Sequence, residues 1–348
     1  MTVARAMVTL GCPSGIGPEV ALVAATQQRS ARVLLVGDHG AALAAAVGRG
    51  VDPTRLVRVE EPGQGWTVPR GKLAVWQPTR DLAEADRRPG RPTLAAGAAQ
   101  LAWVDAACDG VARGAADALV TGPVSKEQIV RSGAPGSRGF IGHTEHLQKR
   151  LHAREVVMAF WSSSLVTSLA TTHLPLARVS RTLSATLVAR AAFWLAWLLS
   201  RLSKRVPRIA VAALNPHAGE GGLLGTEERT SVVPGIARAR ARLARLGVAA
   251  TLDGPIPAET AFRLAVAGRW SGVVAMYHDQ ATIPMKLIGF GEAVNVSLGL
   301  PIVRTSVDHG TAYDRAGAWS ADASGMRLAI ELAARLGRGA RPTAPGKT

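Results

Sequence analysis

Short apolar runs alternate with alanine-rich or amphipathic runs along most of the chain. The apolar runs are strand-sized, and glycine, proline or asparagine closes many of them. They predict strands near residues 6–11, 32–38, 116–123, 155–163, 165–173, 207–216, 247–255, 272–280 and 293–301. Runs with helical character lie between several of them and predict helices near residues 17–28, 39–50, 227–246 and 259–267.

This alternation predicts an α/β fold with helices around a mostly parallel sheet. The runs at 155–163 and 165–173 have no helix between them, which predicts a local antiparallel pair and therefore a mixed sheet. Residues 61–92 are rich in glycine, proline and charge and are expected to form a loop. The tail from Gly337 to Thr348 is expected to be disordered.

The length of 348 residues predicts one large or two medium domains. The formal net charge is +16, and almost all of the basic charge is arginine spread along the chain. Nucleic-acid binders usually concentrate basic residues with interleaved aromatics, and aromatics are only 4% here. Binding to nucleic acid is therefore not expected, whereas the charge favours attraction of anionic small molecules.

Features of export or membrane insertion are also weak. The two cysteines, Cys12 and Cys108, form no CxxC motif or disulfide framework, and the N-terminus lacks the layout of a signal peptide. The longest apolar run, Ala191 to Leu199, is shorter than the roughly 20 residues of a membrane span and predicts a core or interface helix. We expect a soluble cytoplasmic protein with no membrane partner.

Histidines follow three of the predicted strands. His173, His217 and His278 each stand just after an apolar run, where ligands bind in open α/β sheets. One such histidine is usually structural, but three at separate strand ends suit a catalytic metal with an open position. Nitrogen ligands favour zinc, cobalt or manganese, whereas magnesium prefers oxygen. The spacing alone leaves open whether a metal binds.

A second group is suited to an anion. Lys286, Asn295 and Arg304 offer a point charge, an amide and a bidentate fork within a largely apolar segment. A buried cation needs a partner, and a bound phosphate or carboxylate would supply one. In "GHTEH", helix capping accounts for Thr144 but not for His143. The turn "GCPSGIGPEV" (11–20) is either an anion-binding helix start or an ordinary tight turn, and it is neither a dinucleotide fingerprint nor a P-loop.

Together these blocks resemble the 4-hydroxythreonine-4-phosphate dehydrogenase (PdxA) family of pyridoxine biosynthesis. The resemblance rests on "GCPSGIGPEV", "VTGPVSKEQI", "GHTEHL", "TTHLPL", "NPHAGEGG", "YHDQATIPMK" and "VNVSLGLPIVRTSVDHGTA", in the family's order over residues 11–317. It implies the two-domain fold of the isocitrate and isopropylmalate dehydrogenases, with mixed, mostly parallel sheets and the active site in the interdomain cleft. Domain 1 would comprise residues 1–132 and 308–348, and domain 2, with the dimer interface, residues 133–307.

The resemblance also implies an activity. It is the NAD-dependent, divalent-metal-dependent oxidation of 4-(phosphooxy)-threonine, with decarboxylation to 3-amino-2-oxopropyl phosphate. The enzyme would be a homodimer with shared active sites. The implied ligands of the metal (Zn, Mg, Co or Mn) are His173, His217 and His278, and the implied substrate contacts are His143, Thr144, Lys286, Asn295 and Arg304. Asp279 could orient a metal ligand, and the sequence assigns no general base.

One residue departs from the family pattern. The family's first motif usually reads GDPAGIGPE, and Cys12 stands here at the position of the aspartate. A packed structural thiol is favoured over a reactive one, but loss of the carboxylate bears on the substrate. The alternative is a PdxA-like paralogue that oxidises threonate or erythronate 4-phosphate or a carboxylated dihydrodiol. The choice between NAD and NADP also stays open. From another class, the chain could be a catalytically silent ligand-binding protein, against which the three histidines argue.

Overall fold

The computed structural model describes residues 3–289 and 291–338, and the chain divides into two compact units. The first unit is Met1–Arg154 with Leu300–Thr348, and the second is Glu155–Gly299. The packing thus groups residues 133–154 and 300–307 with the first unit. The expected domain division at 132/133 and 307/308 stays a prediction.

The first unit is built on parallel strands in the order β3-β4-β2-β1-β5-β12. Their apolar side chains are almost all buried, as expected for a parallel sheet covered on both faces. The strands are β1 (Ala4–Thr9), β2 (Ala31–Val36), β3 (Leu56–Val59), β4 (Leu73–Trp76), β5 (Ala118–Thr121) and β12 (Val303–Val307).

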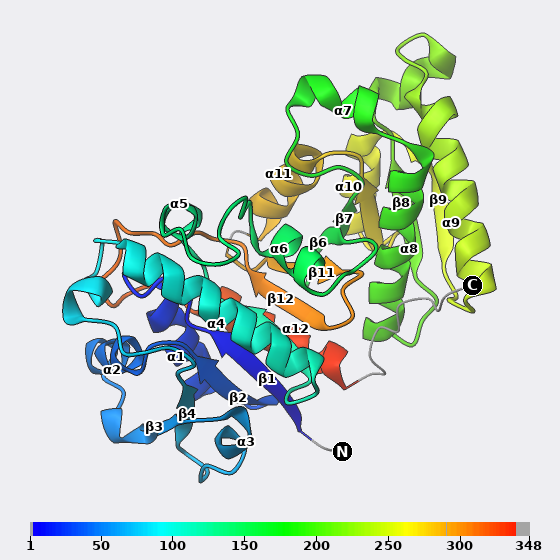
Figure 1. Cartoon of the computed structure of the whole chain (residues 1–348). Helices are drawn as coiled ribbons and strands as arrows, with labels where there is room; N and C mark the ends of the chain where they lie inside the picture. Colours follow the sequence, from blue (N-terminus) through cyan, green and yellow to red (C-terminus); the bar gives the residue numbers. More distant parts are fainter. Residues whose placement is uncertain (1–2, 290, 339–348) are drawn as a thin grey trace. The chain divides into compact units, whose positions relative to one another are not determined.

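Helices cover both faces of this sheet. In Figure 1, α4 lies in front of β1 and α12 behind it, and both pack against β1 and β5. Side-chain caps begin several of these helices: Asp38 accepts from the Ala41 amide at 2.7 Å, and Ser125 from the Gln128 amide at 3.3 Å. The helices are α1 (Gly17–Gln27), α2 (His39–Gly48), α3 (Pro62–Gly65), α4 (Leu94–Ala112), α5 (Lys126–Arg131), α6 (His143–Arg150) and α12 (Ser324–Gly337).

The second unit has a mixed sheet in the order β11-β6-β7-β10-β8-β9. β6 runs antiparallel to both β11 and β7, which confirms the predicted antiparallel pair, and β7, β10, β8 and β9 are parallel. The strands are β6 (Val157–Trp161), β7 (Val166–Leu169), β8 (Arg208–Ala212), β9 (Thr251–Ile256), β10 (Gly272–Ala275) and β11 (Val294–Leu298).

Two helix pairs cover this second sheet. α8 packs on β6, β7, β8 and β10 with α9 against it, while α10 and α11 pack on β10; Figure 1 shows the two pairs on opposite sides. By length and composition alone α8 could cross a membrane, since the helix extends beyond the apolar run 191–199. However, 61% of it is buried inside the structure, as predicted for a core helix. The helices are α7 (Leu176–Thr182), α8 (Ala185–Leu202), α9 (Val233–Arg245), α10 (Ala258–Val266) and α11 (His278–Ile288).

One prediction was wrong within residues 61–92. That segment contains β4, whose four apolar residues are all buried between β2 and β3. The run Leu73–Trp76 is so short that the surrounding glycines, prolines and charges hide it. The tail beyond Arg338 lies outside the described residues.

Candidate active site

The three predicted metal-binding histidines follow three neighbouring parallel strands of the second unit. β10 lies between β7 and β8 in the sheet. His173 follows β7, His217 follows β8, and His278 follows β10 as the first residue of α11. The carboxyl ends of parallel strands share one edge of a sheet, so the reasoning from strand ends puts the three histidines along the same edge.

Two of these histidines are adjacent. The ring centroids of His173 and His278 lie 5.5 Å apart. Nδ1 of His278 is 2.7 Å from Oδ1 of Asp279, and the His278 side chain is 37% exposed. A carboxylate on one imidazole nitrogen fixes the ring so that the other nitrogen can serve as a ligand. His173 and His278 therefore suit a shared cation.

His217 is not grouped with them. Across residues 3–289 and 291–338, no three His, Cys, Asp or Glu side chains are close enough together to form a metal site. His217 is exposed and has a left-handed backbone, with φ of 50°, as do Ala218 (55°) and Glu220 (44°). L-residues pay roughly 1–2 kcal/mol each for this conformation. The structure thus brings two of the three histidines together and puts the third in a strained segment.

The stem of that segment is firmly held, in a way that sequence reasoning missed. Oε1 of Glu228 accepts from the amides of Leu214 (2.9 Å) and Asn215 (2.8 Å), and the Asn215 side-chain amide donates to Glu227 (2.8 Å) and to Glu228 (2.9 Å). A Cβ on Gly225 would lie 2.4 Å from the Asn215 amide nitrogen, so glycine is required there. The "GTEE" that follows the NPHAGE motif was the available signal.

In the first unit, Arg304 is a buried cation. It lies on β12, is 3% exposed, and donates from Nη2 to Oγ1 of Thr121 at the end of β5, at 2.6 Å. Burial lowers the pKa of Arg304 to about 10, and the negative charge of Glu145 opposes that shift. The guanidinium stays charged at neutral pH, so an anion at this position would find a fixed cationic partner.

His143, the first residue of α6, adds a neutral group to this cation. Its Nε2 atom is shielded from solvent and, within the described structure, has no hydrogen-bond partner. Burial, followed by the positive charges of Arg304, His146 and Lys126, lowers the pKa of His143 well below its usual value. The neighbouring Thr144 is buried on the same helix. A neutral imidazole beside a guanidinium suits a phosphate or hydroxyl group.

Lys126 was not predicted as a site residue. It begins α5, and its Nζ would be 3.8 Å from a Cβ on Gly142, the residue that precedes His143. Ser125 fixes the start of α5, and its amide donates to Oε1 of Gln100 at 2.8 Å. Lys126 therefore extends the positive surroundings of His143.

Lys286 and Asn295 belong to the second unit. Lys286 is exposed on α11. Asn295 is partly buried on β11, and its Oδ1 is shielded from solvent without a hydrogen-bond partner in the described residues. An amide oxygen in this state is a ready acceptor for a ligand. The predicted substrate residues are thus divided between the two units.

A cavity of about 800 Å³ lies in the first unit near the starts of α1 and α2, which follow β1 and β2. Residues lining it include Gly15, Gly40, Arg87, Arg88 and Trp319. Its size is within the range of small-molecule sites, and the carboxyl ends of strands are where such ligands bind in α/β folds.

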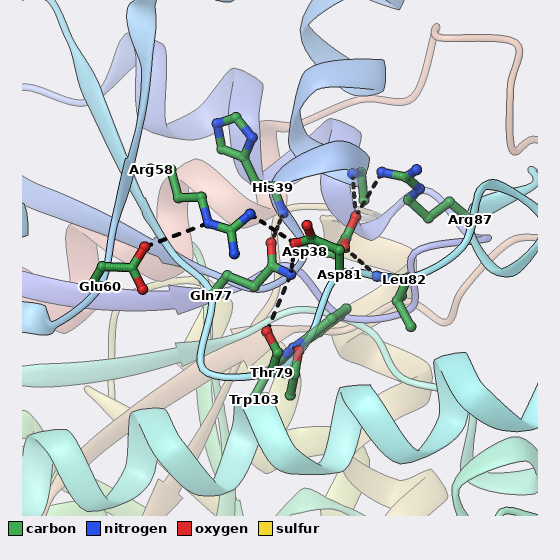
Figure 2. A network of polar contacts seen from close by, with 11 residues as sticks. Asp38, His39, Arg58, Glu60, Gln77, Thr79, Asp81, Leu82, Arg87 and Trp103 are labelled. Carbon is green, nitrogen blue, oxygen red and sulfur yellow. Dashed lines mark hydrogen bonds and ion pairs between the residues drawn. The ribbon is translucent and has the colours of Figure 1, made fainter.

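Arg87, which lines this cavity, belongs to the polar network in Figure 2. Asp38 is fully buried and accepts from the Leu82 amide at 3.0 Å and from Nη1 of Arg87 at 3.3 Å. A Cβ on Gly40 would fall 1.2 Å from that Nη1, so a larger residue at position 40 would displace the guanidinium from its place beside Asp38. Gln77 links the His39 amide (2.7 Å) to Asp81 (2.6 Å). The network fixes the segment around residues 77–88 against the start of α2.

The comparison with known families agrees with these features. The family model described as pyridoxal phosphate biosynthetic protein PdxA matches residues 29–333. The chain belongs to the PdxA family.

Relatives in the PdxA family match over nearly their whole length. The 4-hydroxythreonine-4-phosphate dehydrogenase of Geobacter metallireducens is 42% identical over 342 residues, 96% of each chain. The dehydrogenase of the same name from Acidithiobacillus ferrooxidans is 41% identical and covers 98% of each. The solved structure of the Klebsiella pneumoniae 4-hydroxythreonine-4-phosphate dehydrogenase has a TM-score of 0.80 at 32% identity, covering 96% of this chain and 99% of that one. The predicted family and α/β fold are confirmed.

Cys12 is the departure from the PdxA motif, and the structure makes it a packed thiol. It is fully buried, and its Sγ lies 3.3 Å from the hydroxyl of Tyr313. Burial raises the pKa of Cys12, and burial together with the Cys12 contact raises the pKa of Tyr313 to about 12. Both groups are protonated at neutral pH, which agrees with the structural interpretation of Cys12 rather than a reactive thiolate.

Proposed function

We propose that this protein is a 4-hydroxythreonine-4-phosphate dehydrogenase acting in pyridoxal phosphate biosynthesis. The observation that carries the proposal is the near full-length match, at 42% identity, to a curated enzyme of that name. The reaction would oxidise the hydroxyl-bearing carbon of 4-(phosphooxy)-threonine with NAD as hydride acceptor. Loss of the carboxylate then gives 3-amino-2-oxopropyl phosphate.

The buried cation on β12 supports an anionic substrate. We assign Arg304 and His143 to the anionic end, with Thr144, Lys286 and Asn295 as further contacts. Arg304 is held by Thr121 at 2.6 Å and needs little reordering to receive an oxyanion. The shielded Nε2 of His143 and Oδ1 of Asn295 each gain the partner they lack among the described residues. A ligand group at either atom would satisfy a polar group that is otherwise costly to bury.

The histidines support a divalent metal. His173 and His278, with ring centroids 5.5 Å apart, would hold the ion, and His217 would complete the set. Asp279 orients His278 through Nδ1 and leaves Nε2 as the ligand atom. When bound, a divalent ion polarises the oxygen of the hydroxyl group that is oxidised. Zinc, cobalt or manganese suits imidazole better than magnesium does.

We assign the dinucleotide to the 800 Å³ cavity of the first unit. The turn before α1 packs tightly against Thr311, because a Cβ on Gly15 would lie only 2.6 Å from the Thr311 carbonyl oxygen. Asp38 is fully buried and already paired, so a ribose hydroxyl would find Arg87, Arg88 and backbone groups rather than a free carboxylate. NAD would supply the hydride acceptor there.

The exposed apolar face of α11 supports a homodimer. Ile283, Leu287 and Ile288 are 58%, 82% and 40% exposed, and they flank Lys286. Large apolar side chains grouped on one helix indicate a protein contact. We propose that a second copy covers this face, close to the substrate lysine, and that the enzyme acts in the cytoplasm.

The deciding experiment measures NADH formation with purified enzyme, added divalent metal and a substrate panel. We expect 4-hydroxythreonine 4-phosphate to give the highest kcat/KM, above threonate and erythronate 4-phosphate and carboxylated dihydrodiols. The paralogue alternative would instead be supported by preference for one of the others. The solved terephthalate 1,2-cis-dihydrodiol dehydrogenase from Burkholderia xenovorans is less similar, with a TM-score of 0.67 at 29% identity.

Cys12 provides a sharper form of this test. If the family aspartate interacts with the substrate ammonium, Cys12→Asp should raise preference for the amino acid substrate over threonate phosphate. Loss or gain of one such ion pair corresponds to roughly tenfold or more in the ratio of kcat/KM values. An unchanged ratio would show that Cys12 has a packing role only.

A further inference from the structure

A second large cavity lies at the amino-terminal end of the first unit's sheet. Its volume is about 920 Å³, and it is lined by the starts of β1, β2 and β4 and by the end of α1. His173, His217 and His278 follow the carboxyl ends of their strands, and the Arg304 guanidinium reaches Thr121 at the carboxyl end of β5. β1 alone has six residues, roughly 3.3 Å each. This cavity is therefore distinct from the candidate active site.

Positive charge dominates its wall. Asp117 is the one acidic residue among those lining it in the described structure, and its Oδ2 already accepts from the Arg5 amide at 2.7 Å. Asp52 lies near Arg55 and Lys72, but Thr54 holds its carboxylate through both amide and hydroxyl. The cavity is lined by six cations: Arg5, Arg29, Arg32, Arg55, Arg70 and Lys72.

Backbone carbonyls hold three of these cations in place. Arg32 donates to Val68 O at 3.2 Å, Arg55 to Gly71 O at 2.8 Å, and Lys72 to Thr54 O at 2.8 Å. Each of these bonds uses one donor of a group that has three to five donors. A carbonyl contributes a dipole but no neutralising charge. The cations are thus positioned on the wall, and their mutual repulsion is relieved best by an anion.

We propose that this cavity binds a small organic polyphosphate, such as a nucleoside diphosphate. Six cations line a space of about 920 Å³, within the size range of small-ligand sites, and a polyphosphate can contact more of them than a single phosphate can. Trp66 also lines the space, with the Arg5 guanidinium 5.7 Å from its ring centroid, and provides an aromatic surface for a base. The low aromatic content of the chain, 4%, favours a small ligand over a nucleic-acid strand.

The test is calorimetric titration of full-length protein at physiological salt with inorganic tripolyphosphate, ADP and single-stranded DNA. We expect saturable binding of one tripolyphosphate per chain that R55Q/K72Q weakens about tenfold or more, as expected for loss of charge-assisted hydrogen bonds. R205Q/R245Q is the matched control, because both arginines are exposed on the second unit and the same charge is removed. Its affinity should stay within about twofold of the wild type.

The readouts separate this cavity from the active site. R55Q/K72Q should keep the wild-type KM for the dehydrogenase substrate, since neither residue is assigned to that site. Tighter binding of ADP than of tripolyphosphate, lost in Trp66→Leu, would identify a nucleotide; equal binding would identify the polyphosphate group alone as the ligand. The proposal is overturned by non-saturable binding, by equal weakening in both double variants, or by binding of DNA only.

Discussion

The predicted anion-binding group of the first unit and the predicted metal-binding group of the second unit differ in how firmly the fold holds their side chains before a ligand binds. In the first unit, Arg304 is 3% exposed and fixed by Thr121, and His143 has a shielded nitrogen beside it. In the second unit, His278 is 37% exposed, and His217 is exposed on a left-handed segment apart from its expected partners. A buried cation must be built into the core as it folds, whereas surface imidazoles can be drawn together by the ion that they bind.

Metal removal should have the largest effect on activity, and it tests the histidine group of the second unit. We expect a strong chelator, or His278→Ala, to reduce NADH formation below detection, because the hydroxyl oxygen loses its Lewis acid. Readdition of zinc, cobalt or manganese should restore the wild type but not the variant. His152→Ala, at an exposed histidine outside the set, is the control. Full turnover after chelation would remove the metal from the mechanism.

Arg304→Ala should have the next largest effect on activity, and it tests the anion-binding group of the first unit. Removing one partner of a desolvated charge contact costs about 2–5 kcal/mol, so kcat/KM should fall roughly 30- to 5,000-fold. Arg304→Lys should retain only part of the wild-type kcat/KM, since lysine lacks the bidentate fork. Arg131→Ala, at an exposed arginine paired with Glu127 at 2.8 Å, should leave the kinetics within about twofold. Equal kinetics for Arg304→Ala and Arg131→Ala would contradict the anion contact.

The pH dependence of stability tests whether His143 is as enclosed as its geometry indicates. Burial is the main cause that lowers the pKa of His143 in the folded protein. As pH falls through about 6.5, this histidine therefore takes up a proton in the unfolded chain before it does so in the folded protein. The stabilisation is therefore complete above that pH and is lost as pH falls toward the folded pKa, by at most about 1.4 kcal/mol per unit. In urea unfolding at pH 7 and 5, His143→Gln should lose less stability than wild type. If the free energy of unfolding changes equally with pH in the wild type and in His143→Gln, a group other than His143 takes up the proton.

The smallest effect is expected at Ala218, within the left-handed segment. Glycine avoids the penalty of roughly 1–2 kcal/mol but gains unfolded-state entropy, so Ala218→Gly should stabilise by up to about 1 kcal/mol. Ala95→Gly, at an exposed residue in α4, should destabilise by roughly the same amount. Thermal unfolding of the two variants should shift in opposite directions. Destabilisation by both would show that Ala218 is not left-handed in solution.

The sequence predicted the elements better than the tertiary contacts. Strand ends located His173, His217 and His278 because the carboxyl ends of parallel strands share an edge, a rule that depends only on topology. The strand Leu73–Trp76 was missed because four apolar residues carry little periodicity. The backbone handedness at His217 could not be predicted either, since histidine seldom adopts it and the glycines around it only permit it.

The polar networks were harder to predict from the sequence than the strands and helices. Asn215, Glu227 and Glu228 are close in sequence, yet their bonding depends on how the segment between them turns back. Lys126 lies near Gly142 only because α5 and α6 pack in one unit. Shielding of individual atoms, such as Nε2 of His143, follows from side-chain packing and has no local signature in the chain.

The contact between Arg87 and Gly40 has a consequence for how these proteins diverge. The guanidinium occupies the volume of an absent β-carbon, so residue 40 is constrained by a side chain 47 positions later. In chains that lack an arginine at position 87, residue 40 is free to become alanine, and the buried charge of Asp38 must find another partner or disappear. The three positions should therefore change together in evolution, and a relative that alters only one of them should be the less stable protein.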